Sequence, residues 1–186
     1  MHVTSFLSLF ALQACIGWAI NIQVDLIKRS VEQNATLYAY GGTYSAWSIA
    51  FGRDDGLLYI TENPTSHPAN LIPVTWDLAA ITDECWIANA TFANGTRAGS
   101  MFIESQVGNA VGVFNFTRVA DFNGTVTGFG LFASQLVYNN NTKLQAQFWA
   151  KPTSVVDTYA LMWNYDGVVE DGSFPVVVKA AETNYS

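Results

Sequence analysis

Residues 45–60, with the sequence SAWSIAFGRDDGLLYI, decide the fold class of this 186-residue chain. The first part alternates in polarity, so that Trp47, Ile49 and Phe51 share one face of an extended strand. The motif Gly-Arg-Asp-Asp-Gly follows, and its last residue, Gly56, suits the end of a tight turn because glycine adopts left-handed backbone angles without a clash at Cβ. The stretch therefore predicts a β-hairpin.

Similar short runs continue along the chain, rich in Val, Ile, Thr and aromatic residues and separated by Gly, Asn, Asp and Pro. No long helical periodicity interrupts them, which is typical of all-β proteins. Further strands are expected at residues 37–40, 72–76, 85–92, 100–105, 111–118, 126–132, 144–150, 158–164 and 174–179. About ten strands in one domain favour either an antiparallel β-sandwich or a closed β-barrel, because both hide sheet edges that would otherwise pair with other chains.

The first 19 residues predict a signal peptide, since a short apolar run is followed by small residues that suit cleavage after Gly17 or Ala19. A membrane anchor is the alternative, but the apolar run is shorter than the ~20 residues that span a bilayer. We therefore expect residues 20–186 to form a single all-β extracellular domain with no membrane span.

Asn-X-Ser/Thr acceptor sequences predict N-glycosylation. They stand at Asn34, Asn89, Asn94, Asn115, Asn123, Asn140 and Asn184. An oligosaccharide is bulky and polar, so each acceptor that is used must point into water. By the two-residue period of a strand, Ala88, Ala90 and Phe92 then point inward beside Asn89, while Phe114 and Phe116 point inward beside Asn115. Together with the leader, the acceptors indicate a secreted glycoprotein, extracellular or in the cell wall.

The net charge of −7 argues against a nucleic-acid partner, because such binding needs clustered Lys and Arg and this chain scatters its eight. Cys85 is the only cysteine after the leader, so an intramolecular disulfide is impossible there. We expect it to be a buried hydrophobe, with pairing to a second chain or a role as nucleophile as the alternatives. One cysteine and one histidine, His67, cannot supply the ligands of a zinc site, and we expect no cofactor.

Three sets of residues could carry chemistry. His67 lies between prolines in a segment without a nucleophile elbow, which indicates an ordinary surface loop. Glu104, near the end of an apolar strand, is the first candidate for a glycosidase-type carboxylate pair, against the simpler interpretation of a solvated charge. Asp166, Glu170 and Asp171 could bind calcium, but their spacing matches no calcium motif, which favours an acidic turn before the last strand.

The expected strand at 144–150 contains the strongest candidates for ligand binding. Gln145, Gln147 and Trp149 share one face of it, opposite the apolar Leu144, Ala146 and Phe148. An exposed indole flanked by amides suits a sugar, because the ring stacks on the pyranose while the amides bond its hydroxyls. The alternative is a tryptophan buried between two sheet layers.

Five short motifs carry a resemblance to a known group of proteins: LYAYG at 37–41, DGLLYI at 55–60, FWAKP at 148–152, LMWN at 161–164 and PVVVK at 175–179. Taken together they are similar to small secreted glycoproteins of filamentous fungi, over most of the mature chain. The resemblance implies an extracellular fungal protein and assigns no activity and no functional residue.

The sequence therefore favours a non-enzymatic cell-wall or surface binding protein whose partner is an extracellular carbohydrate or protein. The alternatives are a secreted carbohydrate-active hydrolase that uses carboxylates, and a β-barrel that binds a small hydrophobic ligand. A hydrolase should bring two carboxylates into one cleft, and a ligand barrel should enclose an apolar cavity. A binding module should present an aromatic surface with its carboxylates dispersed.

Overall fold

The computed structural model describes residues 32–42, 44–65, 70–78, 86–104, 109–115, 124–140 and 143–181. The predicted signal peptide lies outside these ranges. The same holds for five single residues discussed above: His67, Cys85, Phe116, Asn123 and Asn184.

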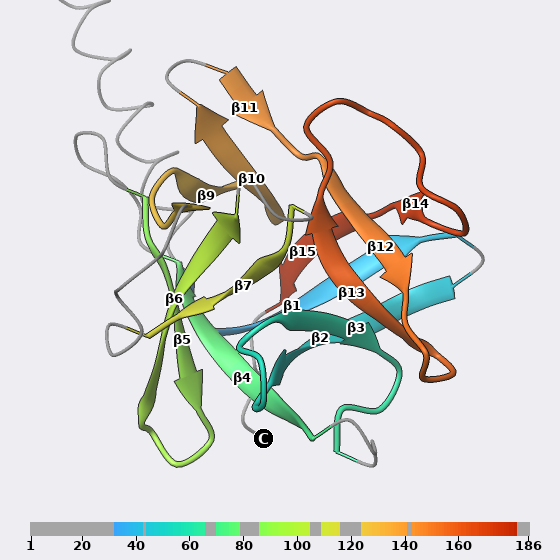
Figure 1. The fold of residues 1–186 in the computed structure, drawn as a ribbon. Coiled ribbons are helices and arrows are strands. Elements are labelled where there is room, and N and C mark those ends of the chain that lie inside the picture. Colours follow the sequence, from blue (N-terminus) through green and yellow to red (C-terminus); the bar gives the residue numbers. More distant parts are fainter. Residues whose placement is uncertain are drawn as a thin grey trace, which may run out of the picture.

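The described residues form strands and no helix, which confirms the all-β prediction (Figure 1). The first eight strands are β1 (Glu32–Gly41), β2 (Tyr44–Gly52), β3 (Leu58–Thr61), β4 (Leu71–Leu78), β5 (Ala88–Phe92), β6 (Arg97–Glu104), β7 (Val111–Phe114) and β8 (Gly124–Thr125). The remaining seven are β9 (Phe129–Phe132), β10 (Gln135–Asn140), β11 (Lys143–Gln145), β12 (Phe148–Pro152), β13 (Thr158–Trp163), β14 (Phe174–Pro175) and β15 (Val177–Ala181). The described part therefore contains no helix that could cross a membrane.

The hairpin predicted at 45–60 is confirmed as β2 and β3, which pair antiparallel from Ser48 to Phe51 of β2. Gly56 has the expected left-handed angle, with φ of 78°, and its N–H donates to the carbonyl of Gly52 over 2.8 Å. The carboxylate of Asp55 accepts the N–H of Leu57 over 2.9 Å and also the hydroxyl of Tyr59. Local turn chemistry therefore fixes this register, as the sequence indicates.

The strands join into one antiparallel sheet of fifteen strands, and its main path runs β11-β10-β15-β1-β4-β2-β3-β13-β12-β14. Strands β5 to β8 branch from β4, and β9 pairs with β10. Among the strands that the structure describes, no pairing joins β11 to β14, so the sheet is open. The closed-barrel alternative is therefore not supported, and neither is the alternative of a barrel that binds a small hydrophobic ligand.

The predicted number of about ten strands is too low because two expected strands are interrupted, and because β8 and β10 lie where no strand was expected. The run 144–150 divides into β11 and β12, and the run 174–179 divides into β14 and β15. In both cases the second piece pairs with different neighbours from the first. Change of partner is a tertiary event that alternation within one strand does not reveal.

Strands β1 and β4 each pair with one neighbour along part of their length and with another along the rest, so the sheet branches at these strands. β1 pairs with β4 at Ala35↔Trp76 and with β2 at Ala39↔Trp47. β4 pairs with β2 through Ile72 and with β5 through Trp76. The branch β5 to β8 therefore continues from one end of β4, while β3, β12 and β13 follow from β2.

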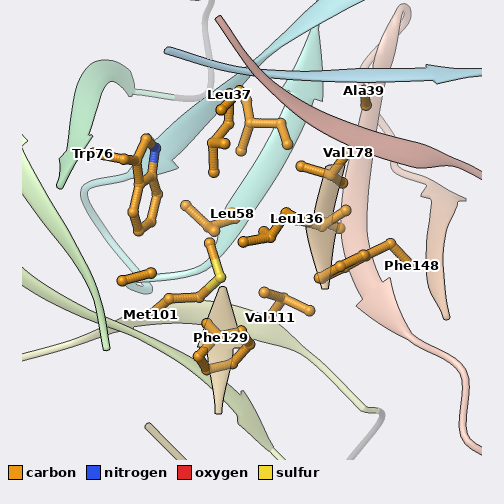
Figure 2. Packing of buried hydrophobic residues seen from close by; sticks show 14 of the residues in the cluster. Leu37, Ala39, Leu58, Trp76, Met101, Val111, Phe129, Leu136, Phe148 and Val178 are labelled. Carbon is orange, nitrogen blue, oxygen red and sulfur yellow. The ribbon is translucent and has the colours of Figure 1, made fainter. Parts of the chain in front are cut away.

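Both parts of the sheet contribute to one hydrophobic core. Its largest fully buried side chains include Leu37, Leu58, Trp76, Met101, Phe129, Leu136, Phe148 and Trp163. Figure 2 shows several of these side chains packed together, with Met101 from the branch and Leu58, Trp76 and Phe148 from the main path. A shared core of this kind is what a single domain requires.

The alternation predicted around Asn89 is confirmed for Ala88 and Ala90 of β5, which are buried with Asn89 on the other face, whereas Phe92 is only half-buried. Asn89 is half-buried, and its Oδ1 accepts bonds from Arg97 Nη2 over 2.7 Å and from Ser100 Oγ over 2.9 Å. The other acceptors within the described ranges are exposed: Asn34, Asn94, Asn115 and Asn140.

The inward direction expected for Phe114 is wrong. Val111 and Val113 of β7 are buried in the core, whereas Phe114 is half-buried on the opposite face. Val113 is paired with Met101 of β6, whose side chain is fully buried, so the register of the two strands sends the valines inward.

Candidate functional site

Trp149, the aromatic residue singled out in the sequence, lines a cleft of about 150 Å³. Residues of β12 and β13 form the floor of this cleft, and residues of the loop 164–173 form a wall. Figure 1 shows this loop between β13 and β14. The polar residues that line it are Asn109, Lys151, Asn164, Asp166, Glu170 and Ser173.

The side chains that form the floor are set by the alternation of inward and outward residues along β12. Phe148 and Ala150 are buried in the core, which places half-buried Trp149 and Lys151 on the outer face. Trp149 is paired with Met162 of β13 on one side and with Pro175 of β14 on the other. The backbone of Trp149 is therefore held by a strand on each side, and its side chain leaves the sheet on the outer face.

The loop wall is organised by the side chain of Asn164. Its Nδ2 donates to the carbonyl of Val168 over 2.9 Å, and its Oδ1 accepts the N–H of Gly167 over 2.8 Å. Asp166 Oδ1 accepts the N–H of Val168 over 3.2 Å, and Gly167 adopts a φ of 71°. These are the local bonds that asparagine and aspartate form in turns, and they give the wall a defined shape.

An ion pair ties the far end of the loop to the floor. Lys151 Nζ contacts Glu170 Oε2, and the two side chains are 43% and 52% exposed. Ser173 Oγ donates to the carbonyl of Glu170 over 2.7 Å, which holds this part of the loop close to the start of β14. An ion pair this exposed stabilises the fold by only about 0–1 kcal/mol, so its main effect is to orient two charged groups at the cleft.

Asn109, in the segment before β7, also lines the cleft. Asn109 has a φ of 52°, and its carbonyl accepts the N–H of Trp163 over 2.7 Å. Trp163 is fully buried, with its ring 4.9 Å from that of Phe148 and 6.1 Å from that of Tyr165. Burial, and to a lesser extent the nearby Tyr138, raises the pKa of Tyr165 above its ordinary value. This part of the cleft is therefore backed by closely packed aromatic rings.

Gln145 and Gln147 do not join Trp149, contrary to the sequence prediction. The expected strand is broken between them, since β11 ends at Gln145 and β12 begins at Phe148. Both glutamines are half-buried with Oε1 atoms that are enclosed and have no hydrogen-bond partner, and neither residue lines the cleft. The break arises because β11 pairs with β10 while β12 pairs with β13 and β14.

The opposite face of this run differs from the prediction as well. Only Phe148 of the three apolar residues is buried, whereas Leu144 is 50% exposed and Ala146 is exposed. Leu144 lies in β11, a short edge strand, and Ala146 lies in the break between β11 and β12.

The fold places only two of the four carboxylate candidates at the cleft. Glu104 lies half-buried at the end of β6, paired with Gly124, and is not among the residues that line the cleft. Asp166 and Glu170 line the cleft, but Asp171 does not. Within the described ranges no three His, Cys, Asp or Glu side chains gather as they would around a metal ion.

The sequence did not single out Asn109, Lys151 or Asn164 as site residues. Asn164 had a usable signal, because Asn followed by Asp166 and Gly167 is a turn pattern. Asn109 had none, since it reaches the cleft only through the pairing of Ala110 with Met162.

Comparison with known proteins adds no relative: no family model matches the chain, and neither a curated protein nor a solved structure matches it. The resemblance to secreted fungal glycoproteins therefore stays a prediction.

Proposed function

We propose that this protein is a secreted, N-glycosylated binding protein that acts at a cell wall or another extracellular surface and holds carbohydrate in the cleft beside Trp149. The observation that carries the proposal is a half-buried tryptophan whose backbone is held between two strands and which shares a cleft with amide, carboxylate and ammonium groups. This combination matches the two kinds of surface on a sugar.

The apolar C–H face of a pyranose stacks on an aromatic ring, and its hydroxyls need both donors and acceptors. Trp149 offers the ring. Asn109 and Asn164 border the cleft with amide groups, Asp166 adds acceptor oxygens, and Lys151 adds a donor. The volume of about 150 Å³ lies below the range of roughly 300–1,000 Å³ that encloses drug-sized ligands, which favours one sugar unit of a longer chain.

The test is depletion of the mature glycosylated protein from solution by insoluble chitin, β-glucan and cellulose. We expect Trp149→Ala to weaken retention on the preferred polymer by about tenfold, since a stacking contact contributes up to about 1.5 kcal/mol and 1.4 kcal/mol is a factor of ten. Phe132→Ala is the matched control, because Phe132 is 66% exposed on β9 and does not line the cleft. Equal retention of wild type and Trp149→Ala would refute binding at this cleft, and retention on none of the three polymers would redirect the search to a protein partner.

A second candidate function is a carbohydrate-active hydrolase, and it is favoured by the presence of two carboxylates, Asp166 and Glu170, in the same cleft. Hydrolysis of a glycosidic bond uses one carboxyl as acid and a second carboxylate as nucleophile or base. Glu170 contacts Lys151, which favours a role in holding the loop and the sugar over a role in bond cleavage.

Reducing sugar released in the same tubes distinguishes the two functions. A hydrolase should release sugar, and Asp166→Asn or Glu170→Gln should abolish the release while Glu104→Gln, outside the cleft, leaves it unchanged. Retention without release supports the binding protein.

A further inference from the structure

A second hollow, of about 350 Å³, lies where β2, β4 and the turn after β5 meet. Its lining residues are Phe51, Arg53, Ile72, Phe92, Ala93 and Asn94. The rings of Phe51 and Phe92 contact each other edge to face, with their centroids 5.5 Å apart, and both side chains are half-buried. The hollow is therefore an open, mainly apolar groove with one arginine and one asparagine beside it, which we call the Phe92 groove.

Asn94 is also an N-glycosylation acceptor, in the sequence Asn94-Gly-Thr96. It lies in a tight turn in which Gly95 N–H donates to the carbonyl of Phe92 over 2.8 Å and Phe92 N–H donates to the carbonyl of Thr96 over 2.9 Å. Gly95 takes a φ of 80°, and Asn94 Oδ1 accepts the N–H of Thr96 over 2.9 Å. Because the turn is held at both ends, an exposed acceptor and an aromatic ring two residues before it are fixed beside the same groove.

We propose that the Phe92 groove is filled by the chain's own oligosaccharide, with the first N-acetylglucosamine on Asn94 lying against the ring of Phe92. The apolar face of that sugar would cover Phe92, with Phe51 and Ile72 as the groove's further apolar lining. Arg53, on the rim, provides N–H donors for the sugar's oxygens. The sugar is covalently attached to a lining residue, so it reaches the groove without the entropic cost of bringing a separate ligand to the surface.

A comparison with Asn140 shows why the structure is needed for this inference. Asn140 is likewise an exposed acceptor with an aromatic residue, Tyr138, two positions before it. Phe92 and Tyr138 are both half-buried against the core, but the ring of Tyr138 contacts two core rings, Phe129 at 5.6 Å and Trp163 at 5.5 Å, whereas that of Phe92 contacts the half-buried Phe51. The two acceptors have the same sequence spacing, and at Asn94 the structure places the acceptor and the aromatic ring on one groove.

The proposal depends on glycosylation of Asn94 and is independent of carbohydrate binding beside Trp149. The experiment uses protein secreted from a host that adds N-glycans, with occupancy of Asn94 read by mass spectrometry. Thr96→Ala removes the acceptor sequence but keeps Asn94 and its bond within the turn, whereas Thr96→Ser keeps the acceptor sequence. These two variants therefore form a matched pair that differs in the glycan.

We expect Thr96→Ala to melt about 2 to 4 °C below Thr96→Ser, as one stacking contact would give in a domain of this size. Trimming the glycan to a single N-acetylglucosamine should leave the melting temperature of Thr96→Ser unchanged, because only the first sugar contacts the ring. In a Phe92→Leu background, which keeps an apolar side chain without the ring, the two Thr96 variants should melt together. Asn140→Gln removes a glycan near Tyr138, whose ring already packs against Phe129 and Trp163, so it should change the melting temperature less.

Three results would overturn the proposal. An unmodified Asn94 in the secreted protein removes the occupant. Equal melting temperatures for Thr96→Ala and Thr96→Ser show that the glycan does not contact the fold. A difference that persists in the Phe92→Leu background shows that the glycan acts elsewhere than on the ring.

Discussion

Replacement of Gly99 by alanine should destabilise the protein strongly, because two separate features of the backbone require glycine at this position. Gly99 lies in β6 with a φ of 146°, an angle that other residues rarely adopt. A Cβ there would lie 2.3 Å from the carbonyl oxygen of Phe114 and 2.9 Å from Val113 Cγ1. Both atoms belong to β7, which is paired with β6 at Ser100↔Phe114, so neither can move without disturbing that pairing.

The expected magnitude is the sum of two costs. A strained backbone angle costs about 1–3 kcal/mol, and forcing an extra carbon into a packed site costs about 1–3 kcal/mol. The total of about 2–6 kcal/mol is large beside the 5–15 kcal/mol by which domains are usually stable. At roughly 2–4 °C for each kcal/mol, Gly99→Ala should lower the melting temperature by about 4 to 24 °C.

Gly95→Ala is the control that separates the two costs. Gly95 also has a positive φ, of 80°, but a Cβ there would meet nothing within 4 Å. This variant therefore bears only the backbone cost of about 1–2 kcal/mol, and its acceptor sequence at Asn94 is kept. Thermal unfolding followed by circular dichroism compares the two variants, and equal shifts would refute the close approach of β7 to Gly99.

Two further predictions concern the turn of the first hairpin and the shared core. Burial, followed by the bond donated to Asp55 and the charge of that carboxylate, raises the pKa of Tyr59 above its ordinary value of 10.0. Above pH 10 the folded state keeps a proton that the unfolded chain releases, so the contribution of Tyr59 to the free energy of unfolding is complete below pH 10 and is lost as the pH rises. In urea unfolding, the free energy of unfolding should therefore fall less steeply with alkaline pH for Tyr59→Phe than for wild type. Identical falls for the two proteins would contradict this prediction. Leu37 lies in the main path of the sheet and Met101 in the branch, and both side chains are fully buried in one core. Leu37→Ala and Met101→Ala should each lower the free energy of unfolding by about 2–5 kcal/mol, and each variant should still unfold in one calorimetric transition. Two transitions would show that the two parts of the sheet have separate cores.

Several elements of the fold were predictable because their causes are local. The hairpin at 45–60 is specified by the alternation of Trp47 and Ile49 and by the turn ending at Gly56, and the structure has both. The faces of β5 followed from the same two-residue period, with Ala88 and Ala90 buried. Side-chain direction along one strand depends only on neighbours in the chain, so the sequence is sufficient there.

Trp149 was predictable as a candidate, but its companions were not. Gln145 and Gln147 were grouped with it on the assumption of one continuous strand, and the chain instead changes partners between β11 and β12. Phe114 was assigned to the core because it is next to Asn115 in sequence and residues alternate between the two faces of a strand. The pairing of Val113 with Met101 reverses that assignment. Each error concerns which strand lies beside which.

The sequence by itself determined that this protein is built of antiparallel strands, where its first hairpin turns, and which asparagines stand in Asn-X-Ser/Thr sequences. Only the tertiary structure decided that the sheet stays open, that Asn109 and the loop 164–173 meet Trp149 at one cleft, and that Asn94 lies beside the ring of Phe92 and an open groove. The physical reason is that turn and strand preferences act between residues close in the chain. Clefts and grooves, in contrast, form where the core brings together residues far apart in sequence, such as Asn109 with Trp163 and Phe51 with Phe92.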